Sequence, residues 1–285
     1  MRRGYTLFFI IYFIDLLFIY DFTEDIVVTT VIAGSIYFYI NTISELVARH
    51  NYQTKSIECI SNISQRKKLT DAFEYTQTLI KGINMPNIKL YYIDSQDINA
   101  LTLGKHSIAV TQGLLDVGDR STLVSILSHE LGHIYNGDLF NEHLMLINLM
   151  ALIALLVVFN VMLVGSFWLI ILLISFIGIC RFGFFTLMLG KGLSHMSNWI
   201  IKGFQNTLIF ITNVVARFIG RQNEYSADLF SIKLHPQNGL YLKRFLSRYD
   251  NKINTNSFID ILYSTHPSND KRIERIDKYM ENCIK

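Results

Sequence analysis

Charged residues are scarce in this sequence. Only 17% of its 285 residues are Asp, Glu, Lys or Arg, whereas soluble domains usually carry about a quarter. Hydrophobic residues make up 51%, and the mean hydropathy is +0.30. The net charge of +3 is too small to suggest a nucleic-acid partner. The composition therefore predicts a chain that lies partly in a lipid bilayer and binds no nucleic acid.

Cysteine is scarce as well. The three cysteines, Cys59, Cys180 and Cys283, show no CxxC spacing. This excludes a zinc ribbon and a disulfide framework, and it indicates a reducing compartment for the soluble part. Internal repeats and low-complexity segments are also lacking, which leaves an irregular chain with a few long apolar runs.

Two apolar stretches open the chain, Tyr5 to Tyr20 and Ile26 to Ile43. Each is near the roughly 17–25 residues that cross a bilayer as a helix. Arg2 and Arg3 precede the first stretch, as in a signal peptide, but no small-residue cleavage site follows and a second stretch comes at once. We expect an uncleaved anchor. Asp15 lies inside the first stretch; we expect it to pack against a neighbouring span or to lie near a water-filled crevice, and we assign it no role.

The distribution of Lys and Arg predicts the orientation. The loop at residues 21–25 has neither, whereas both flanks are basic. Lys and Arg are retained on the cytoplasmic side of a membrane. We therefore expect a multi-pass protein of the inner (plasma) membrane, with the N-terminus and the catalytic part in the cytoplasm. The flanking residues are Arg2, Arg3, Arg49, Lys55, Arg66, Lys67 and Lys68.

A third apolar block, Leu144 to Cys180, contains no charge up to its last residue. It is too long for one comfortable span and barely long enough for two. A fourth segment, Trp199 to Gly220, is apolar but interrupted by polar residues, so it is either a span or an amphipathic helix in the interface. The interrupting residues are Lys202, Gln205, Asn206 and Arg217.

The polar sequence predicts an α+β catalytic part, mostly helical with a small sheet, beside about four transmembrane helices. Runs of β-branched and aromatic residues predict the strands, and apolar spacing predicts the helices. Asp119 is expected to cap a central helix. The predicted organisation is a membrane hairpin at 1–45, catalytic parts at 46–143 and 217–285, and a membrane insert at 144–216. The strands are Ile88–Ile93 and Ser107–Thr111; the other helices are Thr70–Gly82, Gln222–Leu234, Asn238–Arg248 and Asp270–Asn282.

One motif within the central helix carries chemistry. His129, Glu130 and His133 form the pattern H-E-x-x-H. Four residues advance a helix by about 400°, so the two imidazoles share one face and can bind one zinc ion. Glu130 is placed to take a proton from water that zinc has acidified. The pattern is short, and an amphipathic helix with two surface histidines is the alternative.

A hydrolytic zinc site needs a third protein ligand. Glu224 and Asp228 are also four residues apart on a predicted helix. Glu224 would bind the metal, and Asp228, one turn further on, would accept the N–H of a ligand histidine. Taken alone, this segment would be read as a solvated helix face with mixed charges.

A third element is His266, followed by Pro267 and then Arg272. His266 lies at a turn and could donate a hydrogen bond to the oxyanion of a tetrahedral intermediate. Arg272 could pair with Glu224 or Asp228. A His-Pro turn by itself carries little information.

These motifs resemble the HtpX and CAAX-prenyl-protease family of membrane zinc peptidases. The HELGH box, the Glu-Tyr-x-Ala-Asp box and the His-Pro-(five residues)-Ile ending occur in the family's order and spacing. Upstream, the segments 99–104 and 108–115 resemble the strand that precedes the HExxH helix. Asn136-Gly137-Asp138 is similar to the bacterial HtpX branch. The segment before Asn99 shows no such resemblance, and the long charge-free block departs from the family pattern.

The resemblance implies a zinc endopeptidase with a cytoplasmic active site that acts in membrane-protein quality control. It implies Glu130 as the general base, Asp228 behind a zinc ligand, His266 as oxyanion donor and Arg272 as a support. It also favours one long tilted helix at 144–180 that returns through 199–220, over a tight hairpin within 144–180.

The expected reaction uses one zinc ion and a protein or peptide substrate. Glu130 would take the proton of water and pass one to the leaving amine, and His266 would steady the oxyanion. The substrate is expected to bind as an added strand along Ser107 to Thr111. The residues expected to contact it are Asn99, Ala100, Ile108, Ala109 and Val110.

Three other functions share parts of this pattern. An intramembrane site-2-type protease would place HExxH within a span, but polar residues flank it here. A CAAX-type prenyl-protein protease would share the site and differ in substrate. A non-catalytic zinc-binding membrane scaffold would lack the base, whereas Glu130 is present. The sequence gives neither the physiological substrate nor the oligomeric state.

Overall fold

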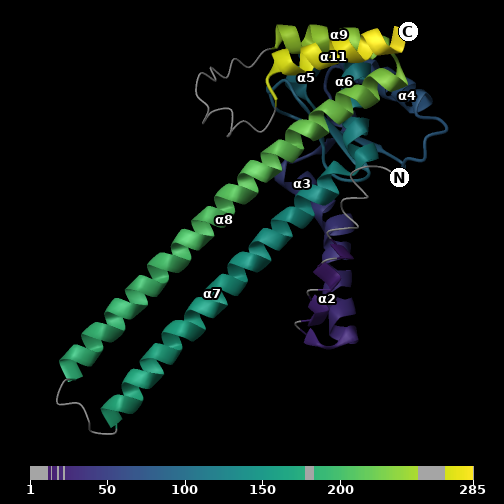
Figure 1. Cartoon of the computed structure of the whole chain (residues 1–285). Coiled ribbons are helices and arrows are strands. Elements are labelled where there is room, and N and C mark those ends of the chain that lie inside the picture. The colour runs from purple at the N-terminus through teal and green to yellow at the C-terminus, as the bar shows by residue number, and fades with distance from the viewer. Residues whose placement is uncertain are drawn as a thin grey trace. The chain divides into compact units, whose positions relative to one another are not determined.

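The computed structural model describes residues 12–13, 15–17, 19–21, 23–176, 183–249 and 267–284 (Figure 1). Within them the chain is mostly helical with one small sheet, as the sequence predicts.

Two compact units form, Met1–Leu144 with Arg217–Lys285, and Met145–Ala216. In chain order the elements are α2 (Ile26–Phe38), a π-helical turn (Tyr39–Ile43), α3 (Ser44–Asn51), β1 (Lys55–Ser56), a 3-10 turn (Ile57–Cys59), α4 (Ile63–Leu79), β2 (Lys89–Ile93), β3 (Ala100–Thr102), β4 (Ser107–Thr111), α5 (Gln112–Val117), α6 (Arg120–Asn136), α7 (Asp138–Phe176), α8 (Gly183–Leu234), α9 (Gln237–Arg248) and α11 (Asn269–Ile284).

The sheet has four strands in the order β1-β2-β4-β3. β2 and β4 are parallel, with Leu90 opposite Ile108, and β3 is antiparallel to β4, with Leu101 opposite Ala109. β4 is therefore paired along both sides. β3 pairs with β4 alone among the described strands, so it forms an edge of the sheet.

Alternate residues of β4 are buried in two different hydrophobic clusters, one on each face of the sheet. Ile108 and Val110 are fully buried in the main core with residues of α4 and α6. Ala109, also fully buried, points the other way and belongs to a small cluster with Leu101 and with Ala48 of α3. This alternation is the period-2 pattern of a strand, and it buries β4 on both faces.

The central helix α6 is fixed at both ends. The side chain of Asp119 accepts a hydrogen bond from the backbone N–H of Thr122 at 2.7 Å, which satisfies a free donor of the first turn. Leu127 and Leu131 are almost fully buried. Gly137 ends the helix with a φ of 75°, a left-handed conformation that suits glycine. α7 then begins at the next residue.

The end of the N-terminal helical segment contacts the four-stranded sheet. The carboxylate of Glu45 on α3 accepts hydrogen bonds from the hydroxyl of Ser107 and from the backbone N–H of His106, the latter at 3.1 Å. Arg49 donates to the hydroxyl of Tyr91 and lies over its ring. The segment that follows α2 is thus packed on the turn between β3 and β4.

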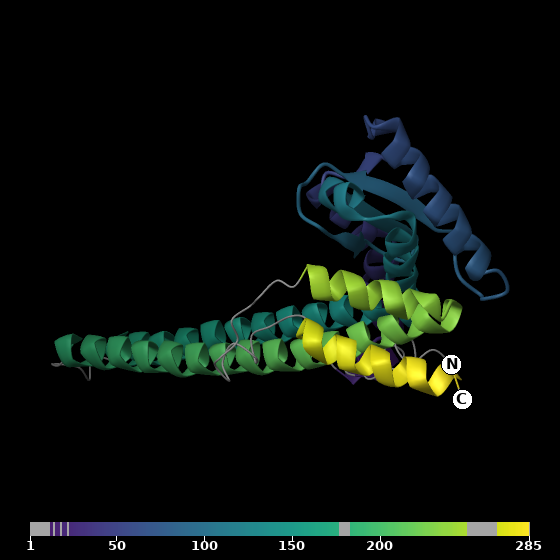
Figure 2. The same ribbon diagram turned by 90° about the horizontal axis from the view of Figure 1, so that it is seen from above.

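The C-terminal helices occupy the positions that the sequence predicts. The helix expected at Gln222–Leu234 is the last part of α8. α9 and α11 lie side by side (Figure 2), joined by an ion pair of Lys243 with Asp277 at 2.7 Å. Because α9 also packs against α6, this arrangement brings α11 near the central helix.

Within Met145–Ala216, the helices α7 and α8 lie side by side (Figures 1 and 2). Asn160 of α7 donates to Asn198 of α8 at 2.6 Å and accepts from Ser197 at 3.0 Å. Hydrogen bonds of this kind join helices in an apolar surrounding.

α7 is one uninterrupted helix from Asp138 to Phe176. It has no turn at Gly165, where a tight hairpin would need one. The structure therefore supports the long helix and not the hairpin within this block.

Two of the described helices are long and apolar enough to cross a membrane, Ile26–Asn51 and Asp138–Leu173. The expected span at Trp199–Gly220 lies within α8, which does not meet that standard of length and composition. The first apolar stretch, Tyr5–Tyr20, lies partly outside the described residues. Four transmembrane helices are therefore not confirmed.

Candidate metal centre

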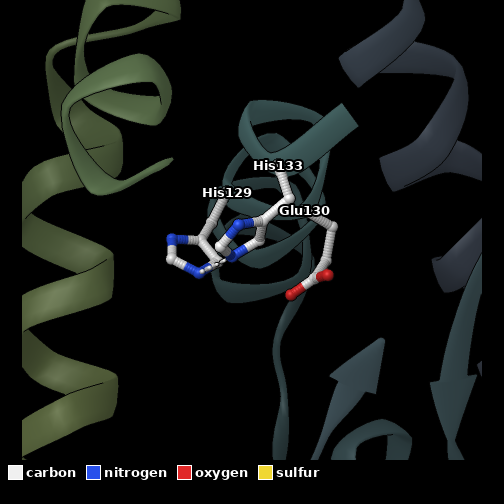
Figure 3. A group of neighbouring side chains, drawn as sticks. All are labelled: His129, Glu130 and His133. Atoms are coloured by element: carbon white, nitrogen blue, oxygen red, sulfur yellow. Dashed lines mark hydrogen bonds between the residues drawn. The ribbon is translucent and has the colours of Figure 1, made fainter. Parts of the chain in front are cut away.

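Two histidine rings face each other on α6. His129 and His133 lie one turn apart, and their rings meet edge to face with centroids 4.8 Å apart. Figure 3 shows both rings and Glu130 extending from this helix. The Nε2 atoms are 3.2 Å apart. Both histidines are buried or nearly so, so the pair points to one shared position.

A carboxylate lies behind each ring. Asp228 Oδ1 is 2.9 Å from His129 Nδ1, and Asp138 Oδ2 is 2.7 Å from His133 Nδ1. When each Nδ1 carries its proton toward a carboxylate, each Nε2 presents a lone pair. Two lone pairs that face each other across 3.2 Å repel unless a cation or a proton lies between them.

Asp138 is a residue that the sequence interpretation missed. In the sequence analysis it is part of the segment Asn136-Gly137-Asp138 and has no role. The signal in the sequence is its place directly after Gly137, because glycine often ends a helix. In the structure the φ of Gly137 is 75°, and the chain turns back toward His133. A carboxylate just past such a turn is a candidate partner for a ligand on the helix that has ended.

Glu224 from α8 completes the cluster. Its Oε2 is 3.4 Å from His129 Nε2, and its Oε1 is 3.9 Å from His133 Nε2. Ligand atoms around a tetrahedral zinc ion with bonds of about 2 Å lie roughly 3.3 Å from one another. The donor set of two imidazoles and one carboxylate, at these separations, therefore fits a zinc ion.

Arg272 of α11 contacts both acidic residues of α8. Its Nε and Nη2 donate to Asp228 at 2.9 and 2.6 Å, and its Nη1 is 3.0 Å from Glu224. Burial alone would raise the pKa of Asp228, but the charges of Arg272 and His129 lower it below the usual value. Asp228 therefore stays ionised at neutral pH.

The protonation of the histidines shows that the site favours positive charge. Burial disfavours the imidazolium of His129, yet Asp228 and Glu224 outweigh burial and raise its pKa to about 10. The pKa of His133 is also raised, against burial, mainly by Asp138. Without a metal the site holds a proton where a cation would bind.

Glu130 lies beside the histidines without pointing its carboxylate at their Nε2 pair. One of its carboxylate oxygens and one nitrogen of each histidine all lie within 4.8 Å of one another. Its Oε2 accepts a hydrogen bond of 2.7 Å from the hydroxyl of Thr102 on β3. Glu130 is thus near the metal position, as a base acting on water there would be.

The substrate-binding prediction needs a correction. Ile108, Ala109 and Val110 are fully buried, and β4 is paired on both sides. A peptide can add only to an unpaired edge, so it cannot pair along Ser107–Thr111. The edge strands of the sheet are β1 and β3, and β3, which includes Ala100, is the one that packs against α6.

The remaining predicted site residues fall in two places. Asn99 directly precedes β3 and is exposed, and its backbone pairs with Thr111. His266 lies outside the described residues, so its role stays a prediction. Of the predicted metal-site residues, the structure brings five together: His129, His133, Glu224, Asp228 and Arg272.

Fold and site together define the class: a membrane metallopeptidase of the HExxH type. The profile of peptidase family M48 matches residues 67–280, and the chain belongs to that family.

Comparison with individual proteins agrees. An HtpX protease homologue of Dictyoglomus turgidum is 32% identical over 146 residues, 48% of this chain and 46% of that protein. A homologue from a Sulfurovum species is 23% identical over 280 residues, 88% of each chain. The crystal structure of S. mikatae Ste24p matches with a TM-score of 0.50 and 14% identity, over 96% of this chain and 64% of that one. The last comparison shows a shared fold.

Proposed function

We propose that this chain is a zinc-dependent endopeptidase of the inner membrane, with a cytoplasmic active site, that cleaves membrane or misfolded proteins. One observation carries the proposal. The Nε2 atoms of His129 and His133 and the carboxylate of Glu224 converge within 3.2 to 3.9 Å, while Glu130 stands beside them with its own carboxylate. This is a three-ligand site with an adjacent base, as zinc hydrolases have.

Zinc bound by His129, His133 and Glu224 would supply Lewis acidity, which acidifies water and polarises a carbonyl oxygen. The protein's residues supply the rest. Asp228 and Asp138 hold the two imidazoles in the orientation that presents Nε2.

Glu130 takes a proton from the attacking water and later delivers one to the leaving amine. Because it is 7% exposed, bulk water competes little for that proton. His266 is proposed as the donor to the oxyanion.

The substrate is proposed to bind in extended form along the outer edge of β3. Main-chain hydrogen bonds of that kind are indifferent to side-chain identity. Such binding suits an enzyme that acts on many unfolded or misassembled segments. Two described helices are long and apolar enough to cross a membrane, and a site near a bilayer would meet such segments.

A CAAX-type prenyl-protein protease is the second candidate. It is favoured by the fold shared with S. mikatae Ste24p and by the family resemblance. The two candidates differ in substrate: a prenylated C-terminal peptide for one, an unmodified internal sequence for the other. Incubation of the detergent-purified chain with casein and with a farnesylated peptide separates them.

The test of the proposal compares wild type with Glu130→Gln. We expect casein cleavage by wild type, none above a few per cent by Glu130→Gln, and one zinc per chain in both, because Glu130 acts on water and is not a ligand. Glu224→Ala should lose zinc and activity together. An active Glu130→Gln protein would refute the mechanism, and full zinc content in Glu224→Ala would place the third ligand elsewhere.

A further inference from the structure

The edge strand β3 carries a hydroxyl toward the central helix. Ala100 and Thr102 share one face of this strand, and Leu101 occupies the other, where it packs against the small cluster that contains Ala109. β3 packs against α6. The alternation of the strand therefore directs the side chain of Thr102 to the helix that carries HExxH.

The hydroxyl of Thr102 contacts Glu130 twice. It lies 2.7 Å from the carboxylate Oε2 and 3.1 Å from the backbone oxygen of the same residue. A hydroxyl has one proton to donate, and an ionised acceptor binds it at the shorter distance and more strongly. The proton therefore points to the carboxylate.

The carboxylate of Glu130 has little else to hold it. Among the residues that the structure describes, no second hydrogen-bond donor to Glu130 Oε1 or Oε2 is found beside Thr102. A glutamate side chain has three rotatable bonds, and this one lies close to His129 and His133. Without a tether, the carboxylate would be free to turn toward the metal position and act as a ligand.

We propose that Thr102 is the positioning residue of the general base. Its hydroxyl fixes Oε2 of Glu130, which leaves Oε1 to receive the proton of the attacking water. Because Thr102 belongs to the edge strand, a peptide that pairs with β3 also steadies this tether. Alignment of the base and binding of the substrate are thereby linked. The inference rests on the proposed function.

The primary test removes the hydroxyl and keeps the shape. Thr102→Val should lower kcat for casein about 10- to 100-fold, because a displaced catalytic group loses effective molarity. KM should change less than twofold, since main-chain pairing with β3 remains. Thr102→Ser restores the donor and should return kcat to within about threefold of wild type. Thr78→Val, an exposed site on α4, is the matched control and should have wild-type kcat.

A second measurement separates positioning from structural damage. Zinc affinity, determined by competition with a chromogenic chelator, should be equal within twofold in wild type and Thr102→Val. A damaged site would bind zinc more weakly. Thr102→Ala, which cannot overpack the site, serves if the valine variant does not fold.

The Glu130→Asp background tests whether Thr102 acts through the base. The aspartate side chain is one methylene shorter than that of glutamate, so its carboxylate cannot keep the same hydrogen bond to Thr102. Thr102→Val should then cost less than about threefold in kcat, so the two substitutions are strongly non-additive.

Failure of this inference is distinct from failure of the proposed function. An inactive wild type, or an active Glu130→Gln protein, counts against the peptidase mechanism itself. With that mechanism intact, Thr102 has no positioning role if Thr102→Val and Thr102→Ala keep wild-type kcat. The same conclusion follows if Thr102→Ser is as slow as Thr102→Val, or if the loss persists undiminished on Glu130→Asp.

Discussion

Gly132 and Ala227 meet where α6 crosses the C-terminal part of α8. A Cβ atom on Gly132 would lie 2.8 Å from Cα of Ala227 and 3.1 Å from its Cβ. The contact falls between the two histidines of α6 and the two carboxylates of α8. Glycine at this position lets the helices approach closely enough for His129 and Glu224 to share one ion.

The substitution Gly132→Ala should therefore separate the two halves of the metal site. The clash involves backbone, which cannot rotate away, so the helices must move apart by several tenths of an ångström. We expect zinc affinity to fall at least tenfold, with casein cleavage falling in parallel, as measured by chelator competition and peptide release. Gly203→Ala in α8, where a Cβ meets open space, is the control and should match wild type.

The carboxylates behind the imidazoles should each influence zinc binding. Asp228→Ala and Asp138→Ala remove the partners of His129 and His133. Loss of such a partner weakens zinc affinity by about 10–100-fold, which chelator competition measures directly. Asp277→Ala breaks only an exposed ion pair with Lys243 and should leave affinity unchanged. Wild-type affinity in Asp138→Ala would mean that the ring of His133 is oriented by something else.

Zinc affinity should rise with pH. In the metal-free protein, Asp228 and Glu224 outweigh burial and raise the pKa of His129 to about 10, so zinc must displace a proton at any lower pH. The apparent affinity should increase about tenfold per pH unit for each proton displaced, and level off near the raised pKa. Calorimetry in buffers of different ionisation enthalpy at pH 8 should detect about one proton released. Asp228→Asn removes the main source of the shift and should reduce that number.

The same shift predicts the stability of the metal-free protein. A pKa raised on folding, from 6.5 to about 10, stabilises the fold fully below the unfolded value. That contribution is lost as pH rises through the folded value. The stability that this group contributes to the chelated protein should therefore decline as pH rises from 6.5 to about 10, while zinc binds more tightly over the same range.

The turn between β3 and β4 should be sensitive to small changes. A Cβ on Gly104 would lie 2.5 Å from Oε2 of Glu45 and 2.6 Å from its Cβ. The second atom is the root of the side chain, so α3 itself would have to shift. Gly104→Ala should lower the free energy of unfolding by about 1–3 kcal/mol, as overpacking does, measured by thermal unfolding in detergent. Gly34→Ala, which meets nothing within 4 Å, should not show this loss.

The sequence predicts most helices and strands correctly, because strand-forming runs and helix caps depend only on neighbouring residues. The strand Ser107–Thr111 matches β4, and Asp119 caps α6 at the expected residue. The helix expected from Thr70 begins earlier, at Ile63, because the side chain of Asn62 caps it.

Features that depend on tertiary pairing were not predictable in this way. Nothing in the residues of β4 shows that it lies between two other strands, so the sequence analysis expects a substrate along a strand that has no free edge. Thr102 acquires its partner Glu130 only when β3 is placed against α6. By contrast, Glu224 and Asp228 were foreseen because a zinc hydrolase needs a third ligand and their spacing puts both on one helical face.

The last prediction concerns the membrane path between the two halves of the site. His133 and Glu224 approach within 3.9 Å, whereas the apolar core of a bilayer is about 30 Å thick. The chain between them must therefore cross the membrane an even number of times. α7 is a single helix from Asp138 to Phe176, so we predict one outward crossing by α7 and a return through α8.

Cysteine labelling of the intact membrane can test this path. Lys191 lies about two helical turns before Asn198, which is hydrogen-bonded to Asn160 of α7. Asn160 is itself about 33 Å along α7 from Asp138, at a rise of about 1.5 Å per residue. We therefore expect Lys191 on the far side of the apolar core, and Lys191→Cys should react with an impermeant maleimide added outside. Asp119→Cys and Arg221→Cys should react only after permeabilisation. A protected Lys191→Cys would remove the return through α8, and opposite sides for positions 119 and 221 would refute the shared metal site.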